Sequence, residues 1–300
     1  MWLPLRDCYY EFTAKCLSQW VARLPRKVVL PIGASLAWVV FWLSRRERDR
    51  AYRHLALSLE LDAPLVLRRL VRRCFQNMGK NVMEFMQFPR LPPEKIHQFV
   101  TFEGKAHIER ALSQGNGAII LTGHVGNWEL LAASLVANGY PLSAIARQLR
   151  SKRLDALVRA YREKAGYSSI DRDKSVRRAL RCLKRNELLG ILADVDTRTE
   201  GVFVDFFGRP AYTPYGPVAI ALKTGAALLP TFIIRQPDDS HRVIVEPPLS
   251  LEQSGNPQHD WVVNTQKFTK VIESYVRRYP EQWIWMHERW KTQPKERTDD

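Results

Sequence analysis

The chain has 300 residues, of which 45% are hydrophobic, enough for one large core with or without a helical appendage. Lys and Arg number 46 against 31 Asp and Glu, and this formal charge of +15 indicates an anionic partner such as nucleic acid, a membrane surface, an acidic protein or a phosphorylated substrate. The cysteines are scattered without a C-x-x-C pair, which argues against a metal cluster or a disulfide framework and favours a reducing compartment. They are Cys8, Cys16, Cys74 and Cys182.

The N-terminal part reads as helical throughout and is expected to form a separate region over 1–90, followed by an α/β domain over 91–300. Within it, residues 28–44 are seventeen residues without a charge, at the lower edge of the roughly 20 needed to span a bilayer. Arginines on both sides and nearby tryptophans favour a membrane anchor or an in-plane helix over a buried helix of a soluble fold. Because both flanks are positive, the sequence leaves spanning and in-plane arrangements open.

From residue 99 onward, short apolar runs alternate with amphipathic segments, a pattern typical of a mostly parallel sheet with helices on its faces. The sequence therefore predicts an α/β fold. The expected strands are 99–104, 117–123, 141–147, 188–194 and the paired 227–235 and 241–247. The expected helices are 104–114, 127–138, 151–166, 173–185, 216–225 and 259–279. The final ten residues, 291–300, are expected to be loose.

One short stretch, "LTGHVGNWEL" at 121–130, carries the candidate chemistry. Asn127 is a good N-cap, so a helix is predicted to begin there with Glu129 in its first turn. His124 then lies in the loop after a strand, at the edge of the sheet where α/β proteins bind ligands. Gly126 lets the backbone turn sharply and approach a substrate closely.

A histidine and a carboxylate in this arrangement suit acyl transfer to a hydroxyl. His124 would act as general base, and Glu129 would fix its tautomer. No serine or cysteine adjoins the pair, which favours direct attack on an activated acyl thioester. The same H-x4-E spacing recurs at His241 and Glu246, in a predicted strand where odd offsets face opposite sides, so the spacing alone is weak. The residues by themselves leave a catalytic role and a structural turn both open.

Three blocks together resemble a known family. "GHVGNWE" resembles the H-x4-D/E signature of glycerolipid acyltransferases, in the form used by the lipid A biosynthesis lauroyl/myristoyl acyltransferases. The stretch 192–226 resembles that family's paired aspartates followed by V-F-V-x-F-F-G-x-P-A, and "WIWMHERWKTQP" at 283–294 resembles its tryptophan-rich ending. The resemblance covers nearly the whole chain.

The resemblance implies a glycerolipid acyltransferase-like fold and an O-acyltransferase on the cytoplasmic face of a bacterial inner membrane. It implies an acidic acyl carrier protein thioester as donor and a phosphorylated lipid A precursor as acceptor, with no cofactor and no metal. The acceptor hydroxyl would be the 3-hydroxyl of an acyl chain already on the glucosamine disaccharide. Residues 147–185 hold fourteen Lys and Arg against four Asp and Glu, and this charge suits both anionic substrates.

Further site residues follow from the same resemblance. Arg147 and Arg162 match arginines of the family and are expected to hold acceptor phosphate or the donor's phosphopantetheine. Asp194 ends a strand and is expected in the site, with a loop-capping carboxylate as its alternative. The remaining expected substrate-binding residues are Gly126, Asn127 and Arg209. His287 lies among tryptophans and is left outside the predicted site.

The sequence also departs from the family pattern. Val195 stands where the family usually has glutamine, and His54 stands where it has asparagine, so the acceptor and the chain length are undetermined. A phosphatidylinositol mannoside or other glycolipid acyltransferase that uses acyl-CoA shares the same signature and stays an alternative. A non-enzymatic basic module that binds RNA or membrane is a second alternative. The aromatic interleaving of single-strand binders is missing from 147–185, which argues against nucleic acid.

Overall fold

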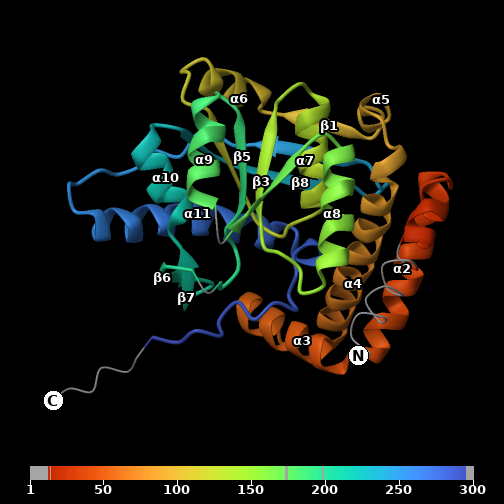
Figure 1. Ribbon diagram of the computed structural model, residues 1–300. Coiled ribbons are helices and arrows are strands. Elements are labelled where there is room, and N and C mark those ends of the chain that lie inside the picture. The colour runs from red at the N-terminus through yellow and green to blue at the C-terminus, as the bar shows by residue number, and fades with distance from the viewer. Residues whose placement is uncertain (1–12, 14, 173–174, 198, 295–300) are drawn as a thin grey trace, which may run out of the picture.

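The computed structural model describes residues 13, 15–172, 175–197 and 199–294, and in them a seven-stranded central sheet carries helices on both faces (Figure 1). The strand order is β1-β9-β8-β2-β5-β3-β4, and β8–β9 is its antiparallel pairing, so β1 and β9 run against the other five strands. The strands are β1 (Val100–Glu103), β2 (Ala118–Thr122), β3 (Leu142–Ala146), β4 (Ser168–Asp171), β5 (Leu188–Leu192), β8 (Ala227–Arg235) and β9 (His241–Val245). A separate hairpin joins β6 (Gly201–Phe206) to β7 (Arg209–Pro214).

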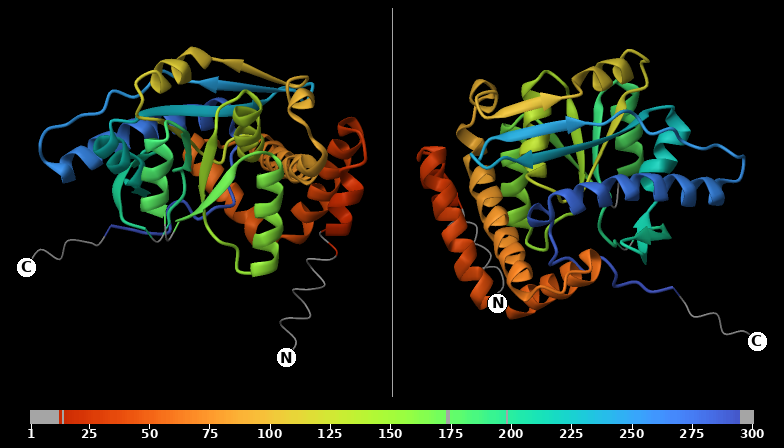
Figure 2. Two further views of the ribbon diagram at one scale, coloured as in Figure 1. Left: turned by 45° about the horizontal axis from the view of Figure 1, so that its top comes forward. Right: turned by 180° about the vertical axis from the view of Figure 1, so that it is seen from behind.

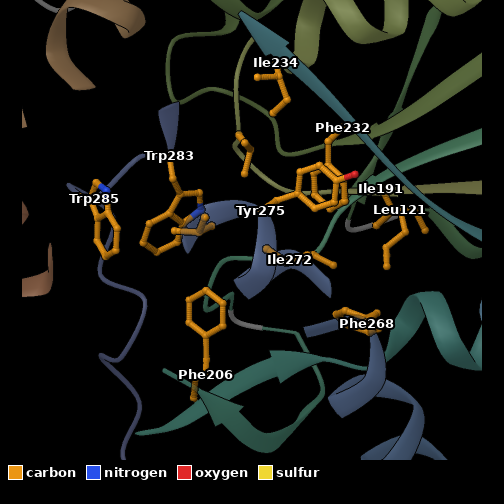
Figure 3. Packing of buried hydrophobic residues seen from close by; sticks show 14 of the residues in the cluster. Leu121, Ile191, Phe206, Phe232, Ile234, Phe268, Ile272, Tyr275, Trp283 and Trp285 are labelled. Atoms are coloured by element: carbon orange, nitrogen blue, oxygen red, sulfur yellow. The ribbon is translucent and has the colours of Figure 1, made fainter. Parts of the chain in front are cut away.

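Two hydrophobic layers enclose the sheet, because successive strand residues point to opposite faces. Ile120 packs with α6 and α7 on one face, whereas Ile119 and Leu121 pack toward α9, α10 and α11 on the other. Figure 3 shows the second layer, in which Phe232 of β8 and Tyr275 of α11 stack with ring centroids 3.8 Å apart. The helices are α6 (Lys105–Leu112), α7 (Trp128–Ala137), α8 (Lys152–Lys164), α9 (Ser175–Lys184), α10 (Gly216–Thr224) and α11 (Pro257–Arg278).

The N-terminal region forms a helical layer beside the sheet domain. Helix α2 (Arg26–Leu43) and helix α4 (Pro64–Gln87) lie side by side, and α3 (Arg45–Leu59) crosses one end of the pair (Figures 1 and 2). Helix α4 ends at Gln87, where the 3-10 turn η1 (Phe88–Arg90) begins, and the short α5 (Pro93–Ile96) leads to β1. The predicted helical character of this region is confirmed for the residues described.

The predicted strands and helices of the sheet domain are confirmed, with three corrections. Strand β4 and the β6–β7 hairpin were not predicted; two prolines in β7 weaken its strand pattern, and β4 is a short edge strand. Residues 291–300 were expected to be loose. This prediction is wrong for the first two of them, because Lys291 and Thr292 both hydrogen-bond Asp196. Residues 295–300 lie outside the described part of the chain.

A buried carboxylate on α4 connects the helical layer to the sheet. Glu84 is 2% exposed and accepts hydrogen bonds from Arg235 Nη2 at 2.6 Å, Asn127 Nδ2 at 2.8 Å and His241 Nε2 at 3.0 Å. Arg26 at the start of α2 also donates to it, through Nε at 3.0 Å. Burial opposes ionisation, but His241 and Arg235 outweigh it and hold the pKa of Glu84 well below its ordinary value. We call these five side chains the Glu84 network.

Asn81, one turn earlier on α4, extends the Glu84 network to the loop after β2. Its side-chain Nδ2 donates to the carbonyl of Gly126 at 2.6 Å, and its Oδ1 accepts from Arg235 Nη2 at 2.8 Å. Gly126 N in turn donates to the carbonyl of Gln282 at 2.9 Å. The loop that contains His124 is therefore held by α4 and by the C-terminal segment.

We expect Glu84→Gln to lower the free energy of unfolding by about 3–5 kcal/mol, because it removes the nearest counter-charge of the buried Arg235 guanidinium and leaves only Asp239, 3.5 Å away. Chemical denaturation monitored by tryptophan fluorescence measures the loss. The ordinary pKa of the carboxyl is 4.5 and its folded pKa is lower, so its contribution is present above pH 4.5 and is lost as the pH falls. The difference between the two proteins should therefore narrow below pH 4.5.

Glu103→Gln is the matched control, since its ion pair with Arg242 is exposed and should contribute at most about 1 kcal/mol. Equal stabilities of the Glu84 variant and the parent protein at pH 7 would contradict the role assigned to the network.

Candidate active site

His124 and Asp194 meet because two neighbouring parallel strands end in register. Thr122 of β2 pairs with Leu192 of β5, and each of the two side chains follows its strand by two residues. The Nδ1 of His124 lies 2.7 Å from Oδ1 of Asp194. The carboxylate's Oδ2 accepts from the backbone N–H of His124 and from Nε1 of Trp283, both at 2.7 Å.

These contacts determine the protonation of the pair. Asp194 is 2% exposed, and burial opposes its ionisation, yet His124 and the Trp283 indole hold its pKa well below the ordinary value. The carboxylate is an acceptor, so Nδ1 of His124 carries the proton and Nε2 is the basic nitrogen. The histidine is thus oriented as the base of a His–Asp pair.

The prediction that Glu129 orients His124 is wrong in geometry. Glu129 accepts from Arg162 through Nε at 2.9 Å and Nη2 at 2.5 Å, and from the hydroxyl of Tyr167 at 2.5 Å. In the first turn of α7 its side chain points toward α8 and β4, while the His124 ring turns toward β5. The carboxylate of Asp194, expected only as a substrate-binding residue, takes the place assigned to Glu129.

Gly126 and Asn127 support the loop and are not among the residues that line the cavity, so their expected role in substrate binding stays a prediction. Gly126 has φ +64°, and a Cβ there would lie 1.7 Å from the carbonyl oxygen of Ile233. Asn127 is 1% exposed; its Oδ1 caps α7 by accepting from Leu130 N at 3.1 Å, and its Nδ2 binds Glu84. The predicted start of the helix at Asn127 is confirmed.

A cavity of about 850 Å³ opens beside His124 at the carboxyl ends of the strands. Its lining is apolar over most of its depth and comes from both faces of the sheet. The α7 side of the lining consists of Ile120, Leu131, Leu135, Leu142, Ala144 and Gly190. The α9–α10 side consists of Val176, Leu180, Ile191 and Ile220.

Basic side chains surround the same cavity, as the charge of 147–185 predicts. Arg147 lines it and is exposed, in agreement with its predicted place. Arg162 also lines it, but two of its nitrogens bind Glu129 and Nη1 donates to Ser169 at 3.1 Å, so it is held by protein partners. The other cationic lining residues are Arg150, Arg172, Lys223 and Lys291.

Arg209 is not among the residues that line the cavity, and its expected substrate contact stays a prediction. Its guanidinium lies 4.9 Å from the ring centroid of Trp290, a cation–π contact that packs β7 against the C-terminal segment.

His287 is a residue of the site that the sequence prediction left out. It lines the cavity, and its ring lies 5.1 Å from that of His124. Although it is exposed toward the cavity, desolvation by the surrounding protein and the nearby His124 lower the pKa of His287 to about 4. His287 is therefore neutral at physiological pH. The tryptophan-rich block at 283–294 contains His287 and could have indicated its place in the site. It was left out because a lone histidine among aromatic residues is more often a packing residue.

Among the described residues, neither a serine or cysteine nucleophile nor a metal ligand set accompanies His124 in the cavity. Burial raises the pKa of the Cys182 thiol to about 11 and that of Cys74 to about 12, as expected for packing residues. The described lining of the cavity includes neither serine nor cysteine, and no three His, Cys, Asp or Glu side chains of the described ranges converge as a metal site. His241 binds Glu84 and Glu246 binds Tyr275, so the second H-x4-E spacing does not form a pair.

This chain is similar in sequence to known proteins. The phosphatidylinositol mannoside acyltransferase of Mycobacterium tuberculosis is 29% identical over 189 residues, which cover 61% of this chain and 60% of that protein. The lipid A biosynthesis lauroyltransferase of Escherichia coli is 26% identical over 278 residues, covering 92% of this chain and 89% of the relative. The lipid A biosynthesis palmitoleoyltransferase of the same organism is 24% identical over 278 residues, covering 92% and 88%.

A family profile described as bacterial lipid A biosynthesis acyltransferase matches residues 8–292, which include His124, Asp194 and His287. The match spans both the helical layer and the sheet domain. The chain belongs to the bacterial lipid A biosynthesis acyltransferase family.

Proposed function

We propose that the protein is an O-acyltransferase that transfers a fatty acyl chain from an acyl carrier protein thioester to a hydroxyl of a lipid A precursor. The reaction would take place on the cytoplasmic face of a bacterial inner membrane and need no cofactor. The observation that carries the proposal is the His124–Asp194 pair, with Nδ1 and Oδ1 2.7 Å apart, beside a deep apolar cavity with a basic rim.

The chemistry follows from the free ring nitrogen. Nε2 of His124 takes the proton of the acceptor hydroxyl while its oxygen attacks the thioester carbonyl carbon. The new C–O bond forms, the C–S bond breaks, and the protonated imidazole returns its proton to the departing thiolate. Asp194 stabilises the imidazolium between these two steps. Direct transfer suits a cavity whose described lining offers no serine or cysteine.

The start of α7 supplies a place for the developing oxyanion. Trp128 and Glu129 form the first turn of this helix and line the cavity. First-turn N–H groups have no partner within their own helix, and the helix dipole adds partial positive charge at this end. The backbone of α7 can therefore stabilise the negative charge that builds up on the thioester oxygen.

The cavity lining matches the two parts of such substrates. Its apolar depth suits a fatty acyl chain, and its cationic rim suits phosphates of a lipid A precursor and an acidic carrier protein. Basic residues that surround a cavity also favour an enzyme over a surface that binds nucleic acid.

Acylation of a phosphatidylinositol mannoside is the second candidate, because the Mycobacterium tuberculosis relative of that name is 29% identical over 189 residues, 61% of this chain. Mass spectrometry of lipid A from a deletion strain separates the two candidates. Loss of one acyl chain supports the lipid A reaction, and fully acylated lipid A would reject it.

We expect His124→Ala and Asp194→Asn to lower kcat by about 10³–10⁴-fold, since the first removes the base and the second leaves it in the wrong tautomer. Glu129→Gln should be milder and raise mainly KM, because Glu129 acts through Arg162 and Tyr167. Transfer from a radiolabelled carrier-protein thioester to a purified acceptor gives both constants. His259→Ala, an exposed histidine on α11, is the control and should keep full activity. A Glu129 variant that is inactive beside an active Asp194 variant would reverse the assignment of the partner.

Arg147→Ala should raise KM about tenfold with kcat nearly unchanged, because the exposed guanidinium contributes charge for binding and no chemistry. Steady-state kinetics at two salt concentrations measure this, and the variant should be less sensitive to salt than the parent. Arg185→Ala, an exposed arginine at the end of α9 that pairs with Glu187, is the matched control. A defect confined to kcat would count against a binding role.

Gly190→Val should shift donor preference toward shorter acyl chains. A Cβ at Gly190 would lie 3.7 Å from Ala144, an ordinary contact, so the fold can accept the side chain while the α7 side of the cavity loses volume. We expect the longest accepted thioester to lose about tenfold or more in kcat/KM. A panel of carrier-protein thioesters tests this, with the shortest ones as the internal control. An unchanged chain-length profile would place the acyl chain elsewhere.

A further inference from the structure

We propose that α2 does not cross the membrane but lies along an anionic lipid leaflet, and that its outward face is the surface by which the protein docks. The proposal rests on the membrane location proposed above and settles the arrangement of the helix there. Helix α2 has a mean hydropathy of 1.5 and is only 22% buried, so most of its apolar surface faces outward. This docking face consists of Val28, Leu36, Trp38, Val39, Val40, Trp42 and Leu43.

The opposite face of α2 is packed on α4 along its whole length. In the middle, a Cβ on Gly79 would lie 2.2 Å from the carbonyl oxygen of Gly33, so the two backbones touch. Near the end of α2, Phe41 meets Phe75 with ring centroids 5.4 Å apart. At the start of α2, Arg26 binds the buried Glu84. Both ends of α2 are therefore attached to the same helix.

Helix α4 itself is not a helix that a bilayer core would accept. Its other side contributes Glu84 and Asn81 to the buried contacts with the sheet domain. Near its start, Arg68 and Arg72 lie over Trp42 and Trp38 of α2, with guanidinium-to-ring distances of 5.7 and 5.6 Å. A spanning α2 would have to break from α4 or draw these charges into the hydrocarbon, and both are costly.

If α2 lies in the plane of the membrane surface, the same tryptophans and arginines stay at the level of the lipid headgroups. Tryptophans prefer the level of the lipid headgroups, and the arginines beside them can reach lipid phosphates. Arg45 and Arg46 follow the helix directly and are exposed. An apolar helix face bordered by arginines is the pattern of interfacial helices that bind anionic lipid. The occupant of the docking face is thus an anionic leaflet.

Helix α3 connects this surface to the active site. Arg50 donates through Nη1 to the carbonyl of Met286 at 3.0 Å and through Nη2 to Glu288 at 2.7 Å, the two neighbours of His287. Helix α3 also lies at the end of the molecule toward which β5 runs (Figure 1), and His287, beside the residues that Arg50 binds, lines the cavity. Docking of α2 would therefore bring the cavity mouth close to the lipid that carries the acceptor.

Cysteine accessibility tests the topology. Arg23→Cys and Arg46→Cys would be made singly in full-length protein whose Cys8 and Cys16 are replaced by serine, and treated with a membrane-impermeant maleimide. Both positions are exposed, on either side of α2. We expect both to react in inverted inner-membrane vesicles and neither in intact spheroplasts. Reaction of the two positions from opposite sides would overturn the proposal.

Vesicle binding tests the docking face. Trp38→Gln with Trp42→Gln should weaken sedimentation with phosphatidylglycerol vesicles about tenfold, whereas Val262→Gln, an exposed apolar residue on α11, should not. Neutral phosphatidylcholine vesicles should bind the parent protein more weakly. Unchanged binding of the double variant to phosphatidylglycerol would also reject the docking face. Acyl transfer by the same proteins is measured separately, so an inactive protein that still docks would count against the enzymatic proposal alone.

Discussion

The ionised carboxylate of Glu84, buried where the helical layer meets the sheet, is the interaction on which the rest of the structure depends. It is shared by Arg26 of α2, Arg235 of β8, His241 of β9 and Asn127 at the start of α7. A buried charge is tolerated only when its partners are held in place around it. The same carboxylate therefore sets the position of helices α2 and α4 and of the loop that bears His124.

The parallel register of β2 and β5 brings His124 and Asp194 together. Because the two strands end level, residues two positions beyond each end come together, and the histidine meets an aspartate seventy residues away in sequence. Glu129 is only five residues from His124, but the helix that carries it directs it toward Arg162. The nearby carboxylate thus builds the cavity wall, and the distant one forms the His–Asp pair.

Basic side chains occupy three different parts of the molecule. Cationic residues of 147–185 gather at the cavity, those around α2 border an apolar face, and Arg50 of α3 binds beside His287. The net charge of +15 is thus spread over the cavity, the border of α2 and helix α3. Helix α3 follows α2 in the chain and contacts the two neighbours of His287, so the surface proposed to bind lipid and the cavity involve neighbouring parts of the chain.

The sequence by itself determined the alternation of strands and helices, the N-cap at Asn127, the place of His124 after a strand, and the apolar character of α2. These are local properties, decided by periodicity, capping and hydrophobicity within one segment. Only the tertiary structure decided that Asp194 pairs with His124, that His287 faces the cavity, and that Arg209 packs on Trp290. Those contacts depend on strand order and register, which join residues far apart in the chain and leave no mark in local spacing.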